Sequence, residues 1–248
     1  MEYIIIFKGI KKIENMNLNL KTIKYYYLTT GRNDLRKNHI MDILKDYDLT
    51  EVNPILDIPK QQSGSIGYSR MIDAGIHNQN RNKQFQSYVM LEDDISLNRN
   101  IPENIEIPDD IDILYIGLSP YGVEPNDNFC SGRKGLIYDD VNNDIFRIYN
   151  MLSTHGVIVC SVKGATTLQR CVMEAYYIDY VWDNTIVKVL PFLNVYALKE
   201  PLVYQDFSYG GNPETKISYN DLIKSKTPKE LFYNDKDNIL SLKMMFKK

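Results

Sequence analysis

Hydrophobic and polar residues alternate along the chain in blocks that predict strands and helices. Short apolar runs with the length of buried strands lie at 23–28, 52–58, 88–92, 111–117, 145–149, 155–161 and 195–204. Apolar residues at helical spacing predict helices over 35–47, 61–78, 163–176 and 178–189. The run at 4–7 predicts a further strand at a sheet edge. We therefore expect an α/β fold: a single domain whose mostly parallel, Rossmann-like central sheet has helices on both faces and a small antiparallel extension.

Composition narrows the class of protein. With 248 residues, 44% hydrophobic and 25% charged, the chain can bury one substantial core. A net charge of −3 argues against a nucleic-acid partner, because such surfaces are basic. Three cysteines without Cys-x-x-Cys spacing suggest reduced thiols. We find no signal peptide and no apolar run long enough to span a bilayer, so a cytoplasmic location is expected.

The strand predicted at 88–92 ends in three consecutive acids, Glu92, Asp93 and Asp94. Adjacent carboxylates repel one another, so they suit either a solvated turn or a site neutralised by a divalent cation. The carboxyl end of a strand in an open α/β sheet is where ligands bind, which favours the cation.

Two other segments have residues suited to phosphate. Arg32 and Arg36 follow the strand at 23–28 in a polar turn that leads into a helix, a natural place for a diphosphate, although exposed arginines often have no such role. Gly64 and Gly67 fall at the expected start of the next helix. They suit a close approach of the backbone to a ligand, and helix packing explains them equally well.

Several blocks occur in an order that resembles glycosyltransferase family 25, the group of lipooligosaccharide and procollagen galactosyltransferases with a GT-A fold. The blocks are Tyr-Leu-Thr-Thr-Gly-Arg-Asn-Asp-Leu-Arg (27–36), Gly-Ser-Ile-Gly-Tyr-Ser (64–69), Leu-Glu-Asp-Asp (91–94), Asp-Ile-Leu-Tyr-Ile-Gly (112–117), Ser-Thr-His-Gly-Val-Ile-Val-Cys-Ser-Val-Lys-Gly-Ala (153–165) and Ile-Asp (178–179). The sequence also departs from the family pattern. Met71 and Ile72 stand where the family has Ser-His, and Asp206 lies where GT-A enzymes often supply a metal-binding His.

The resemblance implies transfer of a hexose, galactose or glucose, from a UDP-sugar to a hydroxyl of a glycan or protein acceptor, with inversion. It implies Mn²⁺ or Mg²⁺ as the cofactor, which stabilises the leaving diphosphate. The nucleotide-sugar half would span about 1–118 and the acceptor half about 119–220. A peripheral tail would follow at 221–248.

The same resemblance suggests roles for individual residues. Asp94, with Glu92, would bind the metal; at the place of the family's His, Asp206 or water is the candidate for the third ligand. The nucleotide would be bound through ring stacking and charge. The residues assigned to it are Tyr27, Thr29, Arg32, Arg36, Gly64, Gly67, Glu92 and Asp93.

An inverting enzyme needs a general base, and Asp179 is the first choice, with Asp183 second. The two are four residues apart, so they share a side if both are helical. A helix N-cap is an equally good explanation of Asp179. His155 is a possible acceptor or sugar contact, although a strand histidine of this kind is more often part of the core.

Two other classes remain compatible with the residues. A metal-dependent nucleotidyltransferase would use the same acidic strand end and would release UMP or pyrophosphate rather than UDP. The second class is a non-catalytic relative that binds sugar or nucleotide, which the absence of the family's Ser-His pair makes plausible.

Overall fold

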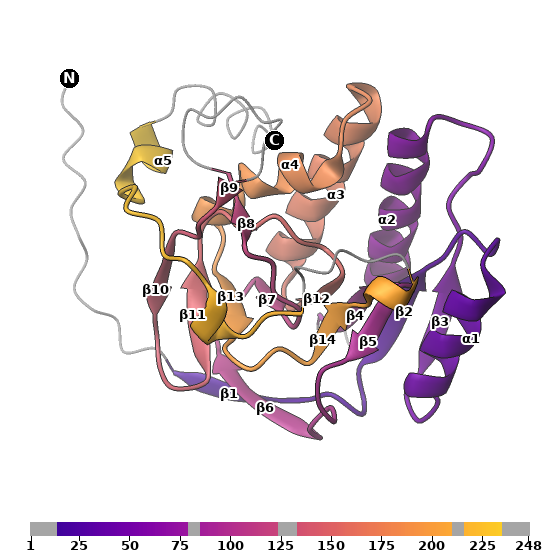
Figure 1. Ribbon diagram of the computed structural model, residues 1–248, viewed down its shortest axis with the longest axis horizontal. Helices are drawn as coiled ribbons and strands as arrows, with labels where there is room; N and C mark the ends of the chain where they lie inside the picture. The colour runs from indigo at the N-terminus through magenta and orange to yellow at the C-terminus, as the bar shows by residue number, and fades with distance from the viewer. Residues whose placement is uncertain (1–13, 79–84, 124–132, 210–215, 235–248) are drawn as a thin grey trace.

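The computed structural model describes residues 14–78, 85–123, 133–209 and 216–234, and within them an eight-stranded sheet is the largest element (Figure 1). Its strand order is β10-β11-β13-β7-β12-β4-β2-β3. The strands of this sheet are β2 (Lys24–Leu28), β3 (Leu49–Val52), β4 (Tyr88–Glu92), β7 (Ile113–Tyr115), β10 (Tyr138–Asp140), β11 (Ile145–Ile148), β12 (Gly156–Val159) and β13 (Val195–Leu198). The helices are α1 (Asp34–Ile43), α2 (Lys60–His77), α3 (Val162–Tyr177), α4 (Trp182–Val187) and α5 (Glu230–Asn234), with short 3₁₀ turns η1 (Leu190–Phe192), η2 (Phe207–Tyr209) and η4 (Tyr219–Asp221).

Strand direction in this sheet is mixed. The pairs β2–β3, β2–β4 and β7–β13 are parallel, whereas β4–β12, β7–β12, β11–β13 and β10–β11 are antiparallel. The α/β class is confirmed, and the sheet is mixed: β11 and β12 run against the other six strands, so three of the seven neighbouring pairs are parallel. β12 lies between β4 and β7 and runs against both of them.

Helices cover both faces of the sheet, as the alternation of side chains along β2 requires. Tyr25 and Tyr27 face one side, in the cluster that contains Ile40 of α1. Tyr26 faces the other side, in the cluster that contains Met71 of α2 and much of α3. The sheet is thus the middle layer between two apolar cores.

The path of the chain creates a switch point between β2 and β4. From β2 the chain passes through α1 to β3 on one side, and then returns through α2 to β4 on the other side. In register, Leu28 at the end of β2 lies beside Glu92 at the end of β4. Ligands of open α/β sheets bind outside the carboxyl ends of strands at such a point.

Three two-stranded ribbons complete the fold. They are β1 (Asn15–Asn19) with β6 (Asn104–Pro108), β5 (Ile95–Leu97) with β14 (Val203–Gln205), and β8 (Tyr121–Gly122) with β9 (Arg133–Lys134). The strands expected within 195–204 do form, but β13 joins the large sheet while β14 pairs with β5. Of these ribbons, β5–β14 lies nearest in sequence to the three acids, because β5 begins directly after Asp94.

Some expected elements differ from those observed. The strand expected at 52–58 ends at Val52, and Pro54, which has no N–H to donate, follows closely. The helix expected over 178–189 is only α4, because Asp179 has φ 49°, a left-handed conformation that separates it from α3. α2 begins at Lys60, so Gly64 lies in its second turn rather than at its start. The strand expected at 4–7 lies outside the described residues.

Candidate functional site

The acids at the end of β4 do not form a solvated turn. Asp93 and Asp94 are buried, with 7% and 8% of their surface exposed, and Glu92 is half-buried. The four preceding residues of β4 are fully enclosed, so the strand carries its charged end to the switch point from within the core. The three carboxylates are therefore held together in a largely dry environment, where like charges repel strongly.

Arg36 is the cation that the structure places against these acids. Asn33 caps α1 by accepting a hydrogen bond from the Arg36 N–H, so the guanidinium of Arg36 projects from the first turn. Its Nη1 lies 3.1 Å from Asp93 Oδ1 and 3.9 Å from Asp94 Oδ2. Burial, and then the neighbouring charge of Glu92, raise the pKa of Asp94 well above its usual range, and Arg36 offsets only part of this.

Asp94 is the residue of the site best suited to a divalent cation. Asp94 Oδ1 is buried and has no hydrogen-bond partner among the described residues. Within the same residues, no three His, Cys, Asp or Glu side chains form a group that could hold a metal by themselves. An ion at Asp94 would therefore complete its shell with water and substrate phosphates, which is how Mg²⁺ usually binds. The chemistry of Asp94 fits such an ion.

Asp206, the expected third ligand, is next to Asp94 but its carboxylate is turned away. Its backbone N–H donates to the carbonyl oxygen of Asp94 at 2.7 Å. Its carboxylate accepts from Ser96 Oγ at 2.7 Å and from the Ser208 N–H at 2.9 Å. Burial alone would raise the pKa of Asp206, but these hydrogen bonds hold it below its usual value. Asp206 thus fixes the β5–β14 ribbon against the acids.

Three polar side chains hold the carboxylate of Glu92. Tyr68 of α2 donates to Oε1, Thr154 Oγ1 lies 3.0 Å from the same oxygen, and Gln205 Nε2 donates to Oε2 at 2.9 Å. The Tyr68 and Thr154 hydroxyls are themselves 3.0 Å apart. Glu92 is therefore oriented by residues from α2, from the segment before β12 and from β14.

The Thr154 hydroxyl that lies near Glu92 also contacts Asp183. Thr154 Oγ1 donates to Asp183 Oδ1 at 2.9 Å, and Asp183 stands in the first turn of α4. Burial, followed by the charge of Glu92, raises the pKa of Asp183 to about 7. Trp182 packs on the ring of Tyr68 at 4.1 Å, which ties α4 to α2. The structure thus brings the second-choice base to the acidic strand end.

Asp179, the first-choice base, is placed differently. It is exposed in the turn between α3 and α4, and the N-cap position of α4 is occupied by Val181. Asp179 and Asp183 therefore do not share a helical face. Neither the shared face nor the N-cap explanation applies to Asp179.

The residues assigned to the nucleotide are only partly brought together. Tyr27 is buried, and its hydroxyl donates to Glu51 Oε2 at 2.9 Å. Burial and this hydrogen bond raise the pKa of Tyr27. Its ring is enclosed in the core. Thr29 is buried at the end of β2, where its hydroxyl accepts from the Gly31 N–H at 3.2 Å, while Arg32 is exposed.

The two glycines of α2 have different explanations. A Cβ added at Gly67 would lie 2.4 Å from Leu28 Cδ1, so Gly67 permits α2 to pack closely on β2. Nothing lies within 4 Å of a Cβ added at Gly64. Packing thus accounts for Gly67, whereas Gly64 has open space beside it.

His155 belongs to the core. It is 2% exposed, its Nδ1 pairs with Ser153 Oγ at 2.8 Å, and burial lowers its pKa to about 4. A Cβ added at Gly117 would lie 2.1 Å from its Nε2. The ring therefore fills a space next to β7 and is neutral at ordinary pH.

Three site residues were missed by the sequence reasoning: Tyr68, Thr154 and Gln205. Each lies inside or beside a segment singled out there, but each was treated as part of a pattern rather than as a side chain with a role. The available signal was a hydroxyl for Tyr68 and Thr154 and an amide for Gln205, each within or beside a predicted helix or strand, and such a signal is weak until the elements are placed in space.

Comparison with known proteins gives no identification. No family model matches the chain, and no curated protein matches it significantly. Among the described residues, no helix has the length and apolar character required to cross a membrane.

Proposed function

We propose that the chain is a metal-dependent glycosyltransferase that moves a hexose from a UDP-sugar to a hydroxyl of a glycan or protein acceptor, with inversion. The observation that supports this most is the set of buried carboxylates at the switch point, with Arg36 on one side and Asp183 on the other. A GT-A-like fold is part of the proposal, since the family that the sequence resembles has it. Galactose and glucose are the favoured sugars on the same ground.

Each side chain has a defined task in this proposal. Asp94 would hold the divalent ion, with Glu92 and Asp93 adding negative charge. When bound, Mn²⁺ or Mg²⁺ would neutralise the charge that develops on the leaving diphosphate. Arg36 presents a second positive charge beside the same position, which suits a phosphate oxygen.

Asp183 is the proposed general base. A base is most effective when its pKa is near the working pH, and burial raises the pKa of Asp183 to about 7. Thr154 fixes the orientation of its carboxylate, and it also connects Asp183 to Glu92. A proton taken from the acceptor hydroxyl would rest on Asp183, while Asp179, on the exposed turn, has no part in this step.

A UDP-release assay over a panel of nucleotide sugars tests the proposal. Wild type, Asp94→Asn and the exposed control Asp109→Asn are each measured with Mn²⁺, with Mg²⁺ and with chelator. We expect metal-dependent UDP release by the wild type and the control, and none by Asp94→Asn. The Asn variant should stay folded, because it removes a buried charge that already costs stability.

Three outcomes would overturn the proposal. One is UDP release that Asp94→Asn leaves unchanged. Another is UMP or pyrophosphate as the product, which indicates nucleotidyl transfer. The third is calorimetric binding of UDP with Mn²⁺ but no turnover of any donor, which indicates a binding protein without activity.

A further inference from the structure

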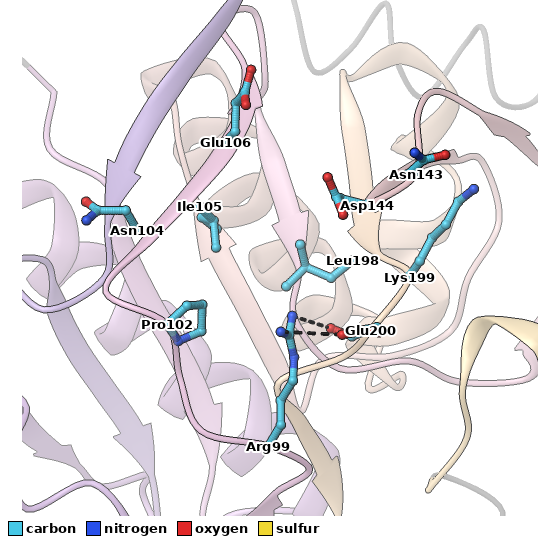
Figure 2. A pocket seen from close by; sticks show the side chains of 10 residues that line it. All are labelled: Arg99, Pro102, Asn104, Ile105, Glu106, Asn143, Asp144, Leu198, Lys199 and Glu200. Atoms are coloured by element: carbon cyan, nitrogen blue, oxygen red, sulfur yellow. Dashed lines mark hydrogen bonds and ion pairs between the residues drawn. The ribbon is translucent and has the colours of Figure 1, made fainter.

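A cavity of about 320 Å³ lies away from the acids, between the β1–β6 ribbon and one end of the large sheet. Figure 2 shows Asn104, Ile105 and Glu106 of β6 along one side. Asp144 and Leu198 lie on the other side. None of these residues takes part in the site described above, so the cavity is a separate feature of the molecule.

The β5–β14 ribbon connects the cavity to the acids. At one end, the Asp206 N–H donates to the Asp94 carbonyl at 2.7 Å. At the other end, Arg99 pairs with Glu200, both of which line the cavity. Four residues separate Asp94 from Arg99, three of them in β5, so the two lie at most about 17 Å apart along the chain. One ligand could therefore reach both places only if it were extended.

The charges of the cavity select against an anion. Arg99 Nη1 lies 3.5 Å from Glu200 Oε2, so this cation is already paired. Lys199 Nζ is 2.8 Å from Asp140 Oδ1 and lies over the ring of Tyr219. The carboxylates of Glu106 and Asp144 add negative charge to the lining. Three acids, Glu106, Asp144 and Glu200, line the cavity against two cations, Arg99 and Lys199, so a phosphate or a carboxylated ligand would meet a net negative lining.

The remaining surface of the cavity suits a neutral polyhydroxyl ring. Asn104 and Asn143 offer amide groups, and Asp144 offers a carboxylate, which are the groups that hydrogen-bond hydroxyls. Ile105 and Leu198 supply an apolar surface against which the C–H face of a ring can pack. The combination of a few polar groups and an apolar surface is typical of ligand sites.

We propose that this cavity binds a neutral sugar unit of an extended acceptor glycan, whose terminal hydroxyl reaches the acids along the β5–β14 ribbon. The proposal rests on the function proposed above and adds the acceptor class: a neutral oligosaccharide rather than a monosaccharide or an anionic glycan. Asp144 and Asn143 are the residues that recognise its hydroxyls.

Saturation-transfer NMR in the presence of UDP and Mn²⁺ tests this directly. The probes are the neutral trisaccharides maltotriose, cellotriose and globotriose, with 3′-sialyllactose and inorganic phosphate as anionic probes. The Asp144→Ala/Asn143→Ala double variant is compared with wild type and with Asp109→Ala, an exposed aspartate just beyond the other end of β6. We expect at least one neutral trisaccharide to bind, and the double variant to weaken it roughly tenfold or more, as the loss of one or two charged hydrogen bonds requires.

The inference is overturned if no neutral trisaccharide binds wild type, if the double variant binds as tightly as wild type, or if an anionic probe binds and loses affinity in the double variant. UDP release measured on the same preparations separates the two proposals. Normal UDP release with variant-insensitive saccharide binding refutes the cavity alone. Variant-sensitive saccharide binding without UDP release from any donor refutes the proposed reaction and leaves the cavity as a saccharide site.

Discussion

Replacing Asp183 with Asn is expected to stabilise the folded protein above neutral pH while abolishing the proposed general base. Asp183 accepts a hydrogen bond from the Thr154 hydroxyl and lies within the field of Glu92. Burial first, and then Glu92, raise its pKa from 3.8 to about 7. An Asn side chain has nearly the same shape and still accepts the hydrogen bond from Thr154, so the substitution removes mainly the charge.

The direction of this pH effect on stability follows from the different pH values at which Asp183 ionises in the folded and the unfolded protein. As pH rises, Asp183 ionises near 3.8 in the unfolded chain but only near 7 in the folded protein. The free energy of unfolding therefore falls between these values and stays low above pH 7. At about 1.4 kcal/mol for each tenfold change in proton affinity, the full cost is at most about 4 kcal/mol. Asp183 is half-buried, so screening by solvent reduces the expected gain from the substitution to about 2 to 4 kcal/mol at pH 8.

Urea unfolding at pH 4.5 and pH 8 measures this gain. Trp182 is the only tryptophan in the sequence and packs on Tyr68, so its fluorescence reports on this region. We expect a large rise in the unfolding midpoint of Asp183→Asn at pH 8 and a small one at pH 4.5. Asp179→Asn, four residues away and exposed, should change neither midpoint. An equal gain at both pH values, or a loss at pH 8, would refute the reasoning.

Three further substitutions test the packing and the charges around the site. Gly67→Ala should lower the free energy of unfolding by about 1 to 3 kcal/mol, because its Cβ would lie 2.4 Å from Leu28 Cδ1. The matched change Gly64→Ala, with no described atom within 4 Å of the added Cβ, should raise the free energy of unfolding by about 0.5 to 1 kcal/mol. Urea unfolding of both variants measures these changes, and equal effects would contradict the prediction. Arg36→Ala should cost about 1 to 3 kcal/mol at pH 8. The cost should be smaller at pH 4.5, because the raised pKa of Asp94 leaves this neighbour of Arg36 protonated there, and a loss independent of pH would argue against the interaction with Asp94.

Local sequence patterns predicted the elements better than their arrangement. The strand ending at Glu92 and the helix over 163–176 are confirmed, because both have a continuous pattern of buried positions. The direction of β12 could not be read from its apolar residues, since parallel and antiparallel partners bury the same side chains. Tyr27 looked available for stacking, but the alternation of β2 turns its ring into the core. The backbone of Asp179 interrupts a helical pattern that side chains alone suggest is continuous.

A buried carboxylate elsewhere in the molecule shows what a purely structural role requires. Asp112 is 4% exposed and accepts hydrogen bonds from Ser161 Oγ at 2.6 Å, Lys163 Nζ at 3.0 Å and the Asn194 N–H at 2.9 Å. These donors supply the charge and hydrogen bonds that a buried carboxylate needs, so Asp112 joins β7, α3 and β13. Asp94, by contrast, has an oxygen without a partner and a raised pKa. Asp112 shows that this fold can supply a buried carboxylate with hydrogen-bond donors for its oxygens. The oxygen of Asp94 that has no partner among the described residues is the group at the switch point that the proposed metal-dependent function would use.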